Sequence, residues 1–226
     1  MSDNKTAHDS SKYDLQVRDT IPYYDSFHNE TINMVKAIKG MPEIWLDTGC
    51  GTGTLVEKAC QVFTNTSFIL ADPSIEMIRE ARKKFSLKSE IEFLEGMPTQ
   101  DITLDNTKKP DVITAIQAHH YLSIDDRYKA VKACFNLLKE NGVYISFENI
   151  KPFTDKGIEL GKRYWANFQL SRGKSEEMVK KHMDRFNMEY FPITVDDHIE
   201  LLKEYGFRVV ELFWYSYMQA GFYCVK

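Results

Sequence analysis

The sequence predicts an α/β fold around a mostly parallel sheet, because short apolar runs alternate with amphipathic helical stretches from residue 44 onward. The run at 111–117 is almost continuously apolar, which is typical of a strand buried on both faces of a parallel sheet. The alternation stops after Ile150, and the segment that follows has the pattern of two helices without a strand between them. We therefore expect one sheet domain that carries a small helical cap.

The individual elements follow from local signals. The expected strands are 44–47, 67–71, 91–94, 111–117, 142–147, 207–214 and 217–225. The expected helices are one that carries Leu55, Ala59 and Val62 at helical spacing, then 74–85, 124–139, two within 154–190, and 195–205. Ser74 is a suitable N-cap for the helix that follows it. Together these elements predict a seven-stranded sheet whose C-terminal strand is antiparallel.

The domain organisation is expected to be simple. The chain of 226 residues forms one domain over 12–226, with the cap inserted at about 151–192 and a flexible tail at 1–11. The cap holds nine Lys or Arg and six Asp or Glu residues, a local charge of about +3 in a chain of net charge −4. It is either a cap with a solvated face or a substrate lid that attracts an anionic substrate. Three of its residues are either lid aromatics or the cap's own core: Tyr164, Trp165 and Phe168.

Composition argues against several classes of protein. No apolar run approaches the roughly 18 residues of a membrane span, and the polar N-terminus lacks the apolar region of a secretory signal. The four cysteines form no CxxC pair, which favours reduced core thiols in a cytoplasmic protein. The net charge of −4 argues against a nucleic-acid partner. No set of His and Cys at ligand spacing predicts a metal site, and the pattern leaves the oligomeric state open.

The strongest motif is the turn Asp47-Thr48-Gly49-Cys50-Gly51-Thr52-Gly53, which directly follows the first strand and directly precedes a helix. Glycines at such a turn let the backbone approach a ligand, and the helix N-terminus presents unpaired N–H groups. A dinucleotide is disfavoured, because Gly53 comes one residue early for that fingerprint and Asp47 would face an anionic pyrophosphate. An acid at this place suits a cofactor that carries an ammonium group.

The stretch from Asp47 to Gly53 resembles motif I of the class I methyltransferases that use S-adenosylmethionine (SAM), whose form is D-x-G-x-G-x-G. The resemblance covers about residues 44–150. It implies a Rossmann-like class I methyltransferase fold, SAM as the cofactor and S-adenosylhomocysteine (SAH) as the product. It also implies that four residues of the turn bind SAM: Asp47, Gly49, Gly51 and Gly53.

Further positions fit the same resemblance. Asp72, followed by Pro73, ends the second strand, where an acid can accept hydrogen bonds from both ribose hydroxyls. Met97 and Pro98 stand where the family often has an acid for the adenine amino group, and Met97 is expected to pack on the adenine face. Gln117, at the end of the fourth strand, is also expected to bind the cofactor.

The two ends of the chain have a narrower resemblance. The segments 18–24 and 206–222 are similar to the carboxy-SAM synthases, bacterial enzymes of tRNA wobble-uridine modification. This resemblance implies that Tyr24 contacts the cofactor. Those enzymes hold an extra carboxylate with an arginine in the cap, and a gapless match puts Met183 at that place. His182 and Arg185 lie nearby, but neither is the match. A carboxylate without a charged partner is poorly held, which favours an ordinary methyl donor.

Two adjacent histidines follow the fourth strand, at the sheet edge where open α/β sheets bind ligands. His119 or His120 could act as a general base on an O, N or S nucleophile, because histidine titrates near neutral pH. The alternative is that both are packing residues beside the cofactor. Four residues near the C-terminus either line an acceptor pocket or pack under the sheet: Tyr215, Tyr217, Met218 and Phe222.

The leading hypothesis is a SAM-dependent methyltransferase that moves a methyl group to a small-molecule acceptor. Two alternatives stay open. One is a cofactor-modifying enzyme of tRNA modification similar to the carboxy-SAM synthases, and the other is a non-catalytic SAM-binding module.

Overall fold

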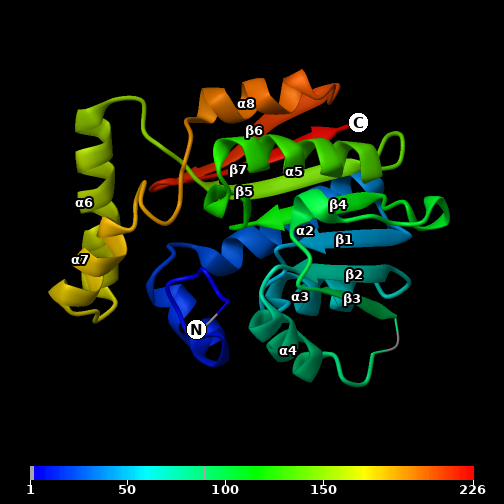
Figure 1. Ribbon diagram of the computed structural model, residues 1–226, viewed down its shortest axis with the longest axis horizontal. Helices are drawn as coiled ribbons and strands as arrows, with labels where there is room; N and C mark the ends of the chain where they lie inside the picture. Colours follow the sequence, from blue (N-terminus) through cyan, green and yellow to red (C-terminus); the bar gives the residue numbers. More distant parts are fainter. Residues whose placement is uncertain (1–2, 89) are drawn as a thin grey trace.

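The computed structural model describes residues 3–88 and 90–226 and has a seven-stranded sheet at its centre (Figure 1). The strand order is β3-β2-β1-β4-β5-β7-β6. The strands are β1 (Ile44–Thr48), β2 (Ser67–Asp72), β3 (Ile91–Glu95), β4 (Val112–Ile116), β5 (Val143–Asn149), β6 (Val209–Ser216) and β7 (Gln219–Val225). Neighbours among β1 to β5 are parallel, whereas β7 is antiparallel to β5 and to β6. The predicted fold class, a mostly parallel seven-stranded sheet with an antiparallel C-terminal strand, is confirmed.

Helices cover both faces of this sheet. The α-helices are α1 (Tyr13–Gln16), α2 (Tyr24–Lys39), α3 (Thr54–Val62), α4 (Ile75–Lys84), α5 (Ile124–Leu137), α6 (Asp155–Ser171), α7 (Glu176–Asp184) and α8 (Val195–Glu204). The 3-10 helices are η1 (Ser10–Lys12), η2 (Val17–Asp19), η3 (Thr99–Asp101), η4 (Asn106–Lys108) and η5 (His119–Tyr121). Helices α2, α3 and α4 contribute to one core cluster, and α5 and α8 contribute to the cluster on the other face.

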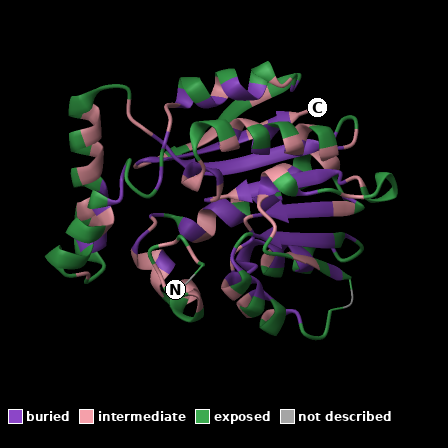
Figure 2. Cartoon of the chain, viewed as in Figure 1, coloured by how far each residue is buried: buried purple, intermediate pink, exposed green. Residues whose placement is uncertain are grey.

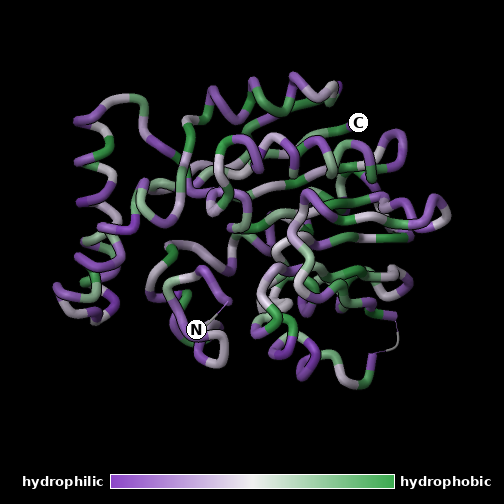
Figure 3. Tube along the Cα trace, viewed as in Figure 1, coloured by the Kyte–Doolittle hydropathy of each residue, from purple (hydrophilic) through white to green (hydrophobic). Residues whose placement is uncertain are grey.

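The central strands are buried because helices cover both of their faces (Figure 2). All seven residues of β5 are buried, and hydrophobic stretches run along the central strands (Figure 3). Trp45 of β1 is fully buried, and its Nε1 donates a hydrogen bond of 2.9 Å to Thr114 Oγ1 of β4. Because its polar atom is satisfied, this large side chain ties two strands together at little cost.

The cap stands beside one end of the sheet, apart from α5 and α8 (Figure 1). It has a small core of its own, which contains Trp165, Val179, Met183, Phe186, Tyr190 and Met218. Trp165 Nε1 donates to the carbonyl oxygen of Thr20 at 2.6 Å, which ties the cap to the N-terminal region. Tyr164 is exposed and stacks on Tyr217, with ring centroids 4.0 Å apart. Trp165 is thus a core residue of the cap, and Tyr164 lies on its surface.

The four cysteines are free and buried. Burial raises the pKa of each thiol, because the thiolate form loses hydration inside the protein. In the part of the chain that the structure describes, no helix combines the length and apolar character of a membrane span.

Replacing Gly53 by Ala tests how tightly the glycine turn packs on its surroundings. Gly53 has φ +77°, and an added Cβ would lie 2.6 Å from Phe85. Gly173 has φ +86° but open space around the same position, so Gly173→Ala is the matched control for backbone strain alone. We expect Gly173→Ala to cost about 1 kcal/mol and Gly53→Ala about 2–4 kcal/mol in urea unfolding, because overpacking adds to the strain. Equal costs for the two variants would contradict this account.

Candidate functional site

A cavity opens at the carboxyl ends of the central parallel strands. This is the edge at which open α/β sheets bind ligands. The cavity is lined by most of the residues that the sequence singles out: Tyr24, Asp47, Gly49, Gly51, Asp72, Pro73, Pro98, Gln117 and His119. They come from several elements that are far apart in the chain. Their assignment to a cofactor stays a prediction, but the fold brings them to one place.

The glycine turn forms one wall of this cavity. Gly49 has φ +66°, and a Cβ there would lie 2.4 Å from the Cβ of Ala118, so the turn and the end of β4 approach closely. Gly51 has φ +55° and nothing within 4 Å of the position of a Cβ, which leaves room for a ligand beside the backbone. The Gly51 N–H donates to Asp72 Oδ2 at 2.8 Å and thereby fixes the second acid against the turn.

Two carboxyl groups face the cavity with raised pKa values. Burial raises the pKa of Asp47 to about 7, with a further contribution from the nearby charge of Asp72. Burial also raises the pKa of Asp72 to about 6. Thr114 Oγ1 donates to Asp47 Oδ1 at 2.6 Å and holds that side chain in place. A cationic ligand between these groups would offset the cost of ionising them in a buried place.

Gly53 and Met97 lie outside the cavity lining. Gly53 caps the start of α3 and packs against Phe85, so its missing side chain makes room for the protein itself. Met97 is partly buried against the core cluster of α5 and α8. Its N–H donates to the carbonyl oxygen of Asp72 at 3.1 Å, so its backbone supports the loop while its side chain packs away from the cavity.

The N-terminal region contributes residues that sequence reasoning missed. Tyr13 lines the cavity, and its ring packs edge-on against that of Tyr24. Asp14 accepts hydrogen bonds from Thr52 Oγ1 at 2.6 Å and Thr54 Oγ1 at 3.0 Å, which fastens α1 to the glycine turn. These contacts join positions almost 40 residues apart, and the local pattern around Tyr13 and Asp14 contains no signal for them.

Gln117 occupies a special position at the end of β4. Its φ is +56°, a left-handed conformation that is uncommon for a residue with a side chain and often marks a functional site. The backbone N–H donates to the carbonyl oxygen of Phe147 at 2.6 Å. Its side-chain Oε1 is buried and has no hydrogen-bond partner among the described residues. This acceptor is therefore available to a ligand.

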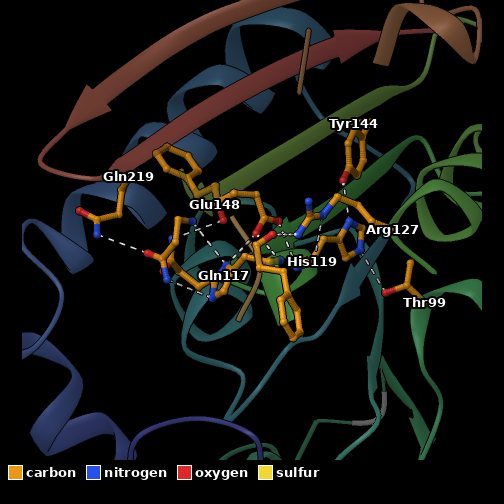
Figure 4. Close-up of polar contacts among 11 residues, drawn as sticks. Thr99, Gln117, His119, Arg127, Tyr144, Glu148 and Gln219 are labelled. Carbon is orange, nitrogen blue, oxygen red and sulfur yellow. Dashed lines mark hydrogen bonds and ion pairs between the residues drawn. The ribbon is translucent and has the colours of Figure 1, made fainter. Parts of the chain in front are cut away.

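The two histidines belong to a buried polar network (Figure 4). His119 Nε2 bonds to Thr99 Oγ1 and its Nδ1 to the hydroxyl of Tyr144, each at 3.2 Å. His120 Nδ1 lies 2.8 Å from Glu148 Oε2, and its Nε2 lies 3.2 Å from the side-chain amide nitrogen of Asn149. Both nitrogens of each ring thus have partners, and His119 alone of the pair lines the cofactor cavity.

Burial lowers the pKa of both histidines, that of His119 to about 4. His119 is therefore neutral at pH 7, and both of its ring nitrogens are engaged by Thr99 and Tyr144. The role of general base stays a prediction for both residues.

A second, smaller cavity adjoins the first. Four residues line both cavities: Thr6, Tyr13, Gln117 and Tyr121. The second cavity is closed on its far side by the cap residues Trp165, His182, Arg185 and Tyr190. Gln117, whose Oε1 has no partner among the described residues, therefore lies at the junction of the two cavities. The C-terminal aromatic residues singled out by the sequence line neither cavity: Tyr215, Tyr217 and Phe222, and likewise Met218.

The structure shows which cap residue faces the second cavity. Met183, the position matched without gaps, packs in the hydrophobic core of the cap. Arg185, two residues later, is 7% exposed and lines the cavity. Its Nε donates to Glu189 at 2.5 Å and its Nη2 to the carbonyl oxygen of Lys5 at 2.6 Å. A buried guanidinium therefore lines the second cavity, because the turn after α7 brings Arg185 there.

Several known proteins are similar to this chain. Residues 46–142 match the model of the family described as Methyltransferase domain. A solved structure of magnesium protoporphyrin IX methyltransferase from Synechocystis, described with bound SAH, covers 92% of this chain and 86% of its own length with a TM-score of 0.65 and 15% identity. The chain has the class I methyltransferase fold.

Two curated relatives extend the comparison to nearly the whole chain. The carboxy-SAM synthase of Nautilia profundicola is 24% identical over 90% of this chain and 86% of its own length. That of Staphylococcus epidermidis is 23% identical over 98% of this chain and 96% of its own length. The resemblance to both groups is therefore confirmed, to the methyltransferases in fold and to the carboxy-SAM synthases in sequence.

The first cavity fits SAM, the cofactor of this class of domain. SAM carries a sulfonium, an ammonium group and two ribose hydroxyls, and the cavity offers the carboxyl groups of Asp47 and Asp72 for them. The open space beside Gly51 admits a ligand close to the backbone. The unpartnered Oε1 of Gln117 provides one more acceptor.

The raised pKa of Asp47 predicts a pH-dependent stability. The pKa is about 7 in the folded chain against 3.8 as an ordinary value, so the folded state binds the proton more tightly. The stabilisation is therefore present at low pH and is lost as pH rises to 7. Relative to the Asp47→Asn variant, we expect the free energy of unfolding of the ligand-free parent to fall by about 2 kcal/mol from pH 5 to pH 8. Parallel urea-unfolding curves for the two proteins across this range would contradict the prediction.

Proposed function

We propose that this chain is a SAM-dependent methyltransferase that acts on a small molecule held in the second cavity. The observation that carries the proposal is the junction of the two cavities at Gln117. SAM is the cofactor, and when bound it supplies a methyl group on a sulfonium sulfur. The second cavity gives an acceptor a buried place next to it, and methyl transfer needs the acceptor atom at about 3–3.5 Å from the methyl carbon.

The residues of the chain have distinct tasks in this proposal. Asp47 and Asp72 hold the polar ends of the cofactor, and the glycine turn lets it approach the backbone. Gln117 accepts a hydrogen bond at the junction and orients either the cofactor or the acceptor. The cap excludes water from the second cavity, because Trp165 and Tyr190 close its far side. The position of this cavity between the cap and the N-terminal region favours a small-molecule acceptor over a macromolecule.

Arg185 favours a second candidate function, a carboxy-SAM-synthase-like modification of the cofactor. Its guanidinium lines the second cavity and is the kind of group that holds a carboxylate in a buried place. The relatives with that name match nearly the whole chain. In the sequence, Met183 stands where the carboxy-SAM synthases have their arginine, which argues against this function. In the structure, Arg185 supplies a guanidinium beside the second cavity instead.

Asp72→Ala tests the cofactor site. Removal of a charged hydrogen-bond acceptor costs roughly 1.5–3 kcal/mol, so we expect the Kd for SAH to rise roughly 10- to 150-fold in calorimetry. The control is Asp105→Ala, which removes an exposed carboxyl outside both cavities. Thermal unfolding of both variants checks that the fold is intact. An unchanged affinity in a folded Asp72→Ala protein would refute the assignment.

Mass spectrometry of the ligand released from the purified, denatured protein separates the two candidate functions. SAM or SAH supports methyl transfer, and carboxy-SAM supports the second candidate.

If carboxy-SAM is found, Arg185→Gln tests which residue holds its carboxylate. We expect this variant to lose carboxy-SAM and to retain SAH binding, because the charged partner of the carboxylate is gone. Lys180→Gln is the control, since Lys180 is exposed on the same cap and lines neither cavity. Loss of carboxy-SAM in both variants would speak against a specific role of Arg185.

A further inference from the structure

The N-terminal residues 3–8, here called the closing segment, line both cavities. Residues 3–6 contribute to the wall of the cofactor cavity, and residues 6–8 contribute to the wall of the second cavity. The segment lies next to the cap and the end of the sheet (Figure 1). It is thus a wall that the two cavities share.

One anchor of the closing segment lies on the cofactor cavity. Asp3 Oδ1 accepts a hydrogen bond from Ser74 Oγ, and Asp3 Oδ2 accepts one from the backbone N–H of Ile75, each at 2.7 Å. The carboxylate therefore bonds to the start of α4, directly after Asp72 and Pro73. A carboxylate is favoured there by the unpaired N–H groups and by the positive end of the helix dipole.

The other anchors lie on the second cavity. The carbonyl oxygen of Lys5 accepts from Arg185 Nη2 at 2.6 Å. His8 Nε2 lies 2.9 Å from Oγ1 of Thr20, and the carbonyl oxygen of the same residue accepts the hydrogen bond from Trp165 of the cap. Each cavity is thus closed by its own polar contacts to one continuous piece of chain.

The closing segment buries little apolar surface of its own. Its six residues are exposed or half-buried, and none belongs to a hydrophobic core cluster. Segments with little buried apolar surface open at a low free-energy cost compared with the core. The segment can therefore leave both cavities while the sheet and helices stay folded.

We propose that residues 3–8 are a removable wall of the binding site, which opens to admit both ligands and closes over them, with Asp3 as its anchor on the cofactor side. The proposal rests on the function proposed above and adds binding residues to it. Asp3 also stands close enough to Asp72 for their charges to repel. A ligand in the cofactor cavity contacts the segment only when the segment is closed, so cofactor binding favours the closed segment.

The test compares Asp3→Ala with Asp9→Ala. Asp9 belongs to the same region and caps η1 in the same chemical way, but it is exposed and lines neither cavity. Loss of a capping carboxylate is worth roughly 0.5–2 kcal/mol, so we expect SAH to dissociate roughly 2- to 30-fold faster from Asp3→Ala in stopped-flow measurements. Asp9→Ala keeps the parent rate, and Asp3→Asn, whose amide oxygen can also cap a helix, recovers part of the loss. Equal rates for all variants overturn the proposal.

Hydrogen exchange without ligand separates this proposal from the proposed function. In the closed segment the Ile75 amide is bonded to Asp3, so its exchange is faster in Asp3→Ala than in the parent and Asp9→Ala. If the Ile75 amide of the parent protein is protected but the parent binds no SAH, the proposed function is wrong, and so is the role of the segment in binding. A parent that binds SAH but shows no difference in exchange overturns the closing segment alone.

Discussion

The carboxylate of Glu148 is the interaction on which the architecture of the site depends. It lies in β5, is 1% exposed, and accepts hydrogen bonds from the backbone N–H groups of His119 at 3.1 Å and His120 at 2.9 Å as well as from the His120 ring. Burial alone raises the pKa of Glu148, but its contacts with His120 outweigh burial and bring the pKa below its usual value. A buried charge is tolerated only when it is paired in this way. One side chain thus fixes the loop that lies between the two cavities.

The cap is bound to the same loop. The N–H of Phe191 donates to the carbonyl oxygen of His120 at 2.7 Å, and Arg127 donates to the carbonyl oxygens of His119 and Phe191. The segment that returns from the cap to the sheet therefore joins the network around Glu148. These hydrogen bonds attach the cap, which has its own small core, to the loop beside the cavities. The backbone N–H groups of the two histidines, and the ring of His120, are bonded to Glu148 and hold the loop in place.

The elements and the cofactor side of the site could be predicted from the sequence because both rest on local patterns. The apolar periodicity located the strands, the Asp47–Gly53 turn located one wall of the cavity, and Asp72 followed from its place at the end of a strand. The rest depends on long-range packing. Arg185 faces the second cavity only because the turn after α7 rotates it there, and a comparison of spacing alone selects Met183. The contact of Asp14 with the glycine turn is equally invisible in the local pattern.

The burial of all four cysteines makes the chain suited to a chemical reporter. Alkylating reagents attack the thiolate, and the raised pKa values and low exposure of the native thiols suppress it. A cysteine introduced in place of Lys5, which is exposed, would therefore be the group that a fluorescent maleimide labels first. The emission of such a label would follow residues 3–8 in real time, without removal of any native cysteine from the core.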